Sequence, residues 1–110
     1  MQDARVTIWK LKTAERLATA LTLVDDPETM RQFLRDVMTE KEIIEVSSRL
    51  EAACMLRGGA KYMDIVEKTK LSSRTIARIS DWLQGGCGGY VKVLDLIESH
   101  TGHMPPVRVE

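Results

Sequence analysis

The stretch that most constrains the fold is residues 61–82, KYMDIVEKTKLSSRTIARISDW. Its apolar residues form two stripes with helical spacing, one over residues 62–69 and one from Ile76 to Leu83. Between the stripes, Ser72 is a typical N-cap, because its hydroxyl can accept a free backbone N–H at the start of the second helix. Leu71 can pack on the first turn of that helix as a hydrophobic staple. Two short helices joined by such a turn form a helix-turn-helix, whose second helix can enter the major groove of DNA.

The remaining sequence predicts further amphipathic helices and no strands. Helices are expected at about residues 9–23, 27–38, 40–57 and 90–99. Asp26 can cap the second of these, while Thr39 and Glu42 form a capping box at the start of the long third one. Gly58 and Gly59 end the long helix, because glycine tolerates the left-handed backbone found there. The glycine-rich residues 85–89 are expected to be a mobile connector.

One domain accounts for the 110 residues. We expect a flexible N-terminal arm at residues 1–8, a helical domain at 9–99 with the helix-turn-helix at about 60–84, and a flexible tail at 100–110. The chain has one Phe, two Tyr and two Trp, so aliphatic and Met side chains must fill its core. A core this thin is marginal for one chain, and dimerisation commonly adds the missing buried surface.

Few residues carry the patterns of enzymes, metal proteins or membrane proteins. Cys54 and Cys87 lack metal-ligand spacing and are typical of reduced thiols in a cytoplasmic protein. His100 and His103 have no third ligand nearby, so no metal is expected. The sequence contains no nucleophile–base pair, carboxylate pair or phosphate loop, which predicts neither an enzyme nor a cofactor. Its apolar runs are shorter than the roughly 20 residues of a membrane span.

Charge is distributed unevenly although the net charge is zero. Residues 25–56 carry eight acids and four bases, whereas residues 57–83 carry six bases and three acids. The bases of the second segment are Arg57, Lys61, Lys68, Lys70, Arg74 and Arg78. The basic excess therefore lies on the helix-turn-helix, where contact with DNA phosphates would need it. An excess of this size is also compatible with an ordinary solvated face.

Residues 55–97 resemble the Trp repressor superfamily, specifically the TrpR-like YerC/YecD group. The segments that carry the resemblance are Leu56-Arg57-Gly58, Tyr62 to Ile65, Leu71 to Arg78 and Gly88-Gly89-Tyr90. The similarity extends over about residues 10–98. It implies an all-α fold, a six-helix bundle that forms an intertwined homodimer. Two helix-turn-helix heads would project from a shared core toward successive major grooves.

Two residues depart from the family pattern in the helix-turn-helix. Lys70 stands in the turn where glycine is usual, because the backbone becomes left-handed there. A non-glycine residue in that conformation costs about 1 kcal/mol. Val66 stands where alanine is usual in the first motif helix, which is expected to separate the two helices slightly.

The outer face of the second motif helix is the candidate DNA-reading surface. Ser73, Arg74 and Ala77 lie opposite Ile76 and Ile79, where contacts to base edges arise. Arg74 is the candidate for a guanine contact; the alternative is a solvated surface arginine. The full predicted DNA-contacting set is Lys61, Tyr62, Lys70, Ser72, Ser73, Arg74, Thr75, Ala77 and Arg78.

Within this set the predicted roles differ. Lys61, Tyr62 and Lys70 are expected at phosphates, where they would fix the register without reading sequence. Tyr62 could instead be half-buried core. Ser72 is first a helix cap and only secondarily a phosphate ligand.

The resemblance also bears on a small-molecule corepressor. In Trp repressor the indole of tryptophan lies between two arginines, one on the long helix and one on the recognition helix. Arg78 matches the second arginine, but the position of the first matches Ser48, so half of the clamp is missing. Thr75 matches a threonine that lines the pocket. Ser48, Thr75 and Arg78 are thus a candidate ligand pocket for which tryptophan is disfavoured. Arg78 would then contact a phosphate or pair with Asp81 or Glu67.

The leading hypothesis is a homodimeric transcriptional regulator of repressor type that binds a palindromic operator in double-stranded DNA. Whether a small corepressor controls it stays open. The alternative is a protein-interaction module that kept the fold but lost operator recognition. The modest basic excess and Lys70 in the turn motivate this alternative.

Overall fold

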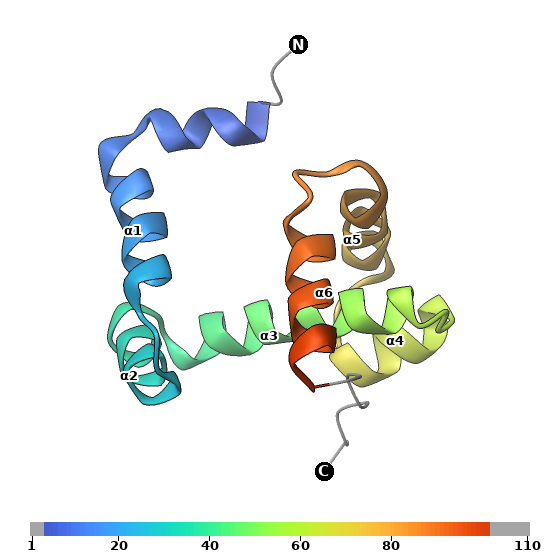
Figure 1. The fold of residues 1–110 in the computed structure, drawn as a ribbon. Coiled ribbons are helices and arrows are strands. Elements are labelled where there is room, and N and C mark those ends of the chain that lie inside the picture. The colour runs from blue at the N-terminus through green and yellow to red at the C-terminus, as the bar shows by residue number, and fades with distance from the viewer. Residues whose placement is uncertain (1–3, 102–110) are drawn as a thin grey trace. The chain divides into compact units, whose positions relative to one another are not determined.

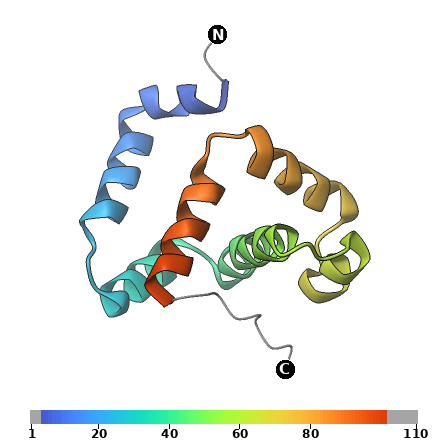
Figure 2. The same ribbon diagram turned by 45° about the vertical axis from the view of Figure 1, so that its right-hand side comes forward.

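The computed structural model describes residues 4–101, which form helices joined by short loops (Figures 1 and 2). The elements in order are η1 (Ala4–Lys10, a 3₁₀ helix), α1 (Lys12–Leu23), α2 (Pro27–Val37), α3 (Glu40–Arg57), α4 (Tyr62–Thr69), α5 (Ser73–Gly85) and α6 (Gly89–Thr101). No strand occurs within these residues, so the predicted all-α class is confirmed. The chain divides into two compact units between Ile43 and Ile44.

Side-chain caps determine where α2 and α3 begin. Thr29 donates its backbone N–H to Asp26 Oδ2 at 2.9 Å. At the start of α3 the capping box is complete: the N–H of Glu42 bonds Thr39 Oγ1 at 3.1 Å, and the N–H of Thr39 bonds Glu42 Oε1 at 2.9 Å. These backbone hydrogen bonds lower the pKa of both the Asp26 and the Glu42 carboxyl. Both predicted caps are confirmed.

The first unit begins differently from the prediction. Residues 4–8, which were expected within the flexible arm, lie in η1, and the first α-helix begins at Lys12 instead of Trp9. Leu11 separates η1 from α1 because its backbone is extended (φ −73°, ψ 122°). Leu11 provides no side-chain cap, so this boundary carries no sequence signal. Neither α1 nor α2 contains a buried residue.

The second unit has a small core to which α3, α4, α5 and α6 all contribute. The side chains with 0–1% exposure are Ala52, Ala53, Ile65, Ile76, Ile79 and Leu94. Because Ala52 and Ala53 end at Cβ, they allow close approach to α3. The partly buried Leu71, Trp82 and Leu83 pack against this core. Ile65 and Thr69 of the first apolar stripe and Ile76 and Ile79 of the second therefore face inward, as their spacing predicts, whereas Tyr62 at the start of the first stripe is exposed.

The last helix is longer than predicted. It runs from Gly89 to Thr101 instead of over residues 90–99, and the connector before it is correspondingly short. Gly88, with φ 87°, accepts a hydrogen bond from the N–H of Lys92 through its carbonyl. His100 therefore lies in α6, although it was expected in the tail; residues 102–110 of that tail lie outside the described residues.

The described residues contain no candidate metal site and no candidate membrane-spanning helix. No three His, Cys, Asp or Glu side chains in the range 4–101 are grouped so that they could hold a metal ion. None of the helices over the same range is both long and apolar enough to cross a membrane.

Candidate nucleic-acid interface

The turn between α4 and α5 is held by hydrogen bonds within a few residues. Lys70 has φ 63° and ψ 14°, and its N–H donates to the Val66 carbonyl at 2.9 Å. The predicted left-handed residue is therefore confirmed. The hydroxyl of Thr69 donates to the Ile65 carbonyl at 2.7 Å and accepts from the N–H of Leu71 at 3.3 Å. The hydroxyl of buried Thr69 thus makes one hydrogen bond to α4 and one to the residue that follows Lys70.

The start of α5 is set by its cap and by its buried face. The N–H of Thr75 donates to Ser72 Oγ at 3.1 Å, and the Ser72 hydroxyl donates to Thr75 Oγ1 at 3.0 Å. Ile76 and Ile79 are both fully buried. Successive helical residues are about 100° apart. The side of α5 opposite these two isoleucines therefore faces outward.

The outward side of α5 carries the residues predicted to read bases. Ser73 and Arg74 are exposed, and Ala77 is half-buried. Thr75 is half-buried beside the cap, whereas Arg78 is exposed. The first turn of α5 thus presents a hydroxyl and a guanidinium to solvent.

Four cations of the motif keep their charged groups unengaged. The side chains of Lys61, Lys70, Arg74 and Arg78 are exposed and make no ion pair or hydrogen bond with another residue in the range 4–101. Arg78 therefore pairs with neither Asp81 nor Glu67, which removes one predicted role. Tyr62, at the start of α4, is 42% exposed, so it is not a core residue in this chain.

Two bases counted in the basic excess are instead engaged within the protein. Arg57 pairs with Asp95 and, at 3.3 Å, with Glu98, both on α6. The hydrogen bond to Asp95 raises the pKa of Arg57. Lys68 Nζ lies 3.3 Å from Glu51 Oε1 on α3. The cationic surface is therefore smaller than the sequence count suggests.

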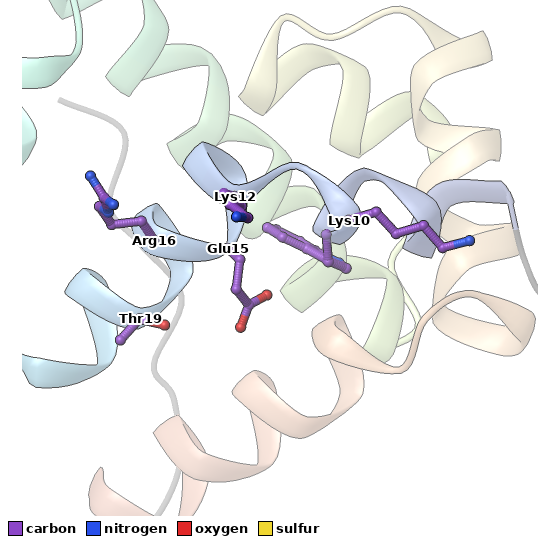
Figure 3. A pocket seen from close by; sticks show the side chains of 6 residues that line it. Lys10, Lys12, Glu15, Arg16 and Thr19 are labelled. Atoms are coloured by element: carbon purple, nitrogen blue, oxygen red, sulfur yellow. The ribbon is translucent and has the colours of Figure 1, made fainter.

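A separate hollow lies on the first unit (Figure 3). Its volume is about 390 Å³ and its lining residues are Trp9, Lys10, Lys12, Glu15, Arg16 and Thr19. All six are exposed, so the hollow is a depression on the surface of η1 and α1 and not an enclosed site. Sequence reasoning did not identify it, because these residues form no motif.

Comparison with known proteins identifies the family. A family model described as Trp repressor protein matches residues 12–98, from the start of α1 to near the end of α6. The chain belongs to the Trp repressor family. This family has a Trp repressor-like regulator fold and is not a family of enzymes.

Individual relatives place the chain near the YerC branch of the Trp repressor family. It is 33% identical over 87 residues to the uncharacterized protein YerC of Bacillus subtilis, covering 79% of this chain and 84% of YerC. A TrpR-like protein from Eubacterium eligens is 34% identical, with a TM-score of 0.75 over 90% of this chain and 98% of that one. A Trp repressor candidate from Staphylococcus aureus is 28% identical, with a TM-score of 0.78 over 87% and 96% of the two chains.

The residues predicted from the sequence to correspond to the tryptophan clamp lie on α3 and α5. Ser48 on α3 and Thr75 on α5 are half-buried, while Arg78 is exposed. Arg49, beside Ser48, pairs through its guanidinium with Glu45 at 2.9 Å on its own helix. The long-helix arginine of the clamp therefore has no counterpart at its own position, and the neighbouring arginine has a partner.

Lys70→Gly is expected to stabilise this member of the Trp repressor family. Glycine adopts φ 63° without the steric cost that a side chain incurs, so the free energy of unfolding should rise by about 0.5–1 kcal/mol. Chemical denaturation measures this change, with Lys61→Gly, just before α4, as the control. A stability equal to or below that of the wild type would contradict the assigned strain at Lys70.

Proposed function

We propose that the protein is a cytoplasmic, sequence-specific DNA-binding regulator of repressor type that acts as a homodimer on a palindromic operator. The observation that carries the proposal is the geometry of α5. Its inner face is fixed in the core through Ile76 and Ile79, and its first turn presents an unpaired Arg74 to solvent. Membership of the Trp repressor family supports the same function.

The residues divide into those that would read bases and those that would hold the backbone. Arg74 suits a bidentate contact with guanine O6 and N7, the commonest specific contact in the major groove. Ser73 and Ala77 would lie beside it against neighbouring base edges. Lys61 and Lys70, whose ammonium groups are unengaged, suit phosphates on either side of the groove. Tyr62, Ser72, Thr75 and Arg78 would complete the contacts with sugar and phosphate.

Exposed apolar side chains support the homodimer. In the first unit, α1 and α2 bury no residue, and Leu17 and Leu23 are 48% and 76% exposed. In the second unit, Val93 and Leu96 on α6 are 45% and 68% exposed. Val93 and Leu96 are three residues apart and so share one face of α6, and neighbouring exposed apolar residues of this kind can mark an interaction surface. A second copy of the chain would cover these surfaces and would place two α5 helices for two half-sites.

Tryptophan is not required in the proposed mechanism. Ser48 stands at the long-helix clamp position, and its hydroxymethyl group cannot stack on an indole as a guanidinium can. Arg78 is therefore assigned to DNA phosphate and not to a corepressor. Operator binding is accordingly expected without added tryptophan.

Arg74→Ala is expected to remove sequence discrimination by the protein. Loss of one bidentate base contact costs about 1–3 kcal/mol, so the affinity for a selected operator should fall by about fivefold or more. Gel-shift titrations of the operator and of a scrambled duplex measure this change. Arg31→Ala is the control, because it removes the same charge from α2, where Arg31 pairs with exposed Glu28.

The outcomes of the gel shift separate the two functional hypotheses. A regulator binds the operator more tightly than the scrambled duplex, and Arg74→Ala abolishes most of that difference. An interaction module binds both duplexes equally weakly, with a strong dependence on salt. Equal operator binding by Arg74→Ala and the wild type would contradict the role of Arg74 while leaving DNA binding itself intact.

A further inference from the structure

The ion pair between Glu51 and Lys68 differs from the other ion pairs of the described residues in its burial. Its two side chains are only 18% and 17% exposed. By contrast, the side chains of the Arg31–Glu28, Arg49–Glu45 and Arg57 pairs are 39–69% exposed. Exposed pairs contribute little to stability, whereas removing one partner of a desolvated pair leaves an uncompensated charge. The Glu51–Lys68 contact is therefore the one most sensitive to geometry.

This pair joins the long helix to the last turn of α4. Glu51 precedes the fully buried Ala52 and Ala53 on α3, and Lys68 precedes the buried Thr69. Lys68 is two residues before the left-handed Lys70, at which the chain turns into α5. A displacement of the end of α4 along α3 would therefore move the turn and the start of α5 with it.

Apolar contact alone fixes the position of α4 along α3 only weakly. The fully buried residues of α3, Ala52 and Ala53, end at methyl groups, and the longer Leu50, Met55 and Leu56 of α3 are only partly buried against the same core. An ion pair between two mostly buried side chains, with the ammonium 3.3 Å from the carboxylate, favours the arrangement that keeps the two charges together. The ion pair can therefore fix the position of α4 along α3, which the alanines alone do not fix.

We propose that Glu51 and Lys68 are a positioning pair that sets the helix-turn-helix against α3, and that Lys68 is not a phosphate contact. The part of this inference that concerns DNA rests on the proposed function. Neither residue touches base or phosphate in this account. Their effect on operator binding passes through the placement of α5.

The direction in which Glu51→Gln changes the affinity for DNA distinguishes the two possible roles of Lys68, positioning α5 or contacting a phosphate. If the pair positions α5, Glu51→Gln weakens binding to the duplex that the wild type selects from a random-sequence pool. The loss should be roughly tenfold, an effect typical of coupled neighbouring charges. If Lys68 were a phosphate contact, the same substitution would free its ammonium and strengthen binding. Glu45→Gln is the control, because it makes the same change in charge at an exposed ion pair on α3.

Two further variants make the DNA measurement decisive. Lys68→Gln should weaken binding as Glu51→Gln does, with an unchanged slope of log affinity against log salt, whereas loss of a phosphate contact lowers that slope by about 1. The reversed pair, Glu51→Lys with Lys68→Glu, should restore most of the affinity. Stronger binding by Glu51→Gln, or a lowered slope for Lys68→Gln, would overturn the proposal.

A measurement without DNA tests the positioning even if no operator exists. In amide NMR spectra, Glu51→Gln should shift resonances along α5 over residues 73–85, and the reversed pair should return them toward wild-type positions. Shifts confined to the neighbours of residues 51 and 68 would overturn the positioning role. Failure of the wild type to select any duplex, together with shifts along α5, would instead contradict the proposed function alone.

Discussion

Ile79→Ala is expected to lower the free energy of unfolding by about 2–5 kcal/mol. Ile79 is fully buried among Ala52, Ala53, Ile65 and Ile76. The same buried core includes two alanines, whose side chains cannot extend into the space that the substitution leaves. The lost transfer energy is therefore accompanied by most of the cost of a cavity. Chemical denaturation followed by circular dichroism measures the difference.

Met63→Ala is the matched control for the Ile79 substitution. Met63 also lies in the helix-turn-helix, but its side chain is 82% exposed, so its truncation should change stability by less than about 0.5 kcal/mol. Equal effects of the two substitutions would mean that the inner face of α5 is not a packed core. The orientation assigned to Arg74 would then fail as well, because it depends on that face.

Leu96→Asp is expected to dissociate the proposed homodimer. Leu96 is 68% exposed in the single chain, where an aspartate would be solvated and nearly harmless. In a dimer that covers α6, the same carboxylate would be desolvated without a partner. The dissociation constant should therefore rise by about a hundredfold or more, which corresponds to about 2.7 kcal/mol. Light scattering across a concentration series measures the mass.

Ser99→Asp is the control for Leu96→Asp, because it adds the same charge to the same helix at a polar, exposed position. The wild type and this control should have about twice the 12.4 kDa mass of the chain, while Leu96→Asp should approach the mass of one chain. Thermal stability of the wild type should also rise with protein concentration. A wild-type mass near 12.4 kDa would contradict the homodimer.

The sequence predicted elements well where both ends carried chemical signals. The long helix α3 has the predicted bounds because Thr39 and Glu42 cap its start and Gly58 and Gly59 follow its end. The motif was located equally well, since Ser72 caps α5 and the inner stripes have clear spacing. Local hydrogen bonding determines these boundaries, so a local pattern is enough to find them.

Boundaries without such signals were misplaced. The apolar spacing continues from Trp9 into α1, yet the helix is interrupted at Leu11, which has no capping side chain. The seven residues of η1 make little more than two turns of a 3₁₀ helix, which is too short for apolar spacing to distinguish it from an α-helix. At the other end, no stop signal precedes His100, and α6 continues through it.

The sequence predicted which residues of α5 face outward, but not which basic side chains are engaged in ion pairs within the protein. Ser73, Arg74 and Ala77 follow from helical spacing, because the face opposite Ile76 and Ile79 must point outward. The engagement of Arg57 and Lys68 could not be predicted, since their partners lie far away in sequence. Asp95 is 38 residues from Arg57, and only the packing of α6 brings the two together.

The most direct test of the central claim is selection of duplexes from a random-sequence pool by the wild-type protein, without added tryptophan. Two symmetry-related α5 helices in successive major grooves should select an inverted repeat. The centres of its half-sites should be about one helical turn, or 10 base pairs, apart. Enrichment of such a repeat by the wild type, and not by Arg74→Ala, is the predicted result. Failure to enrich any sequence would contradict the account.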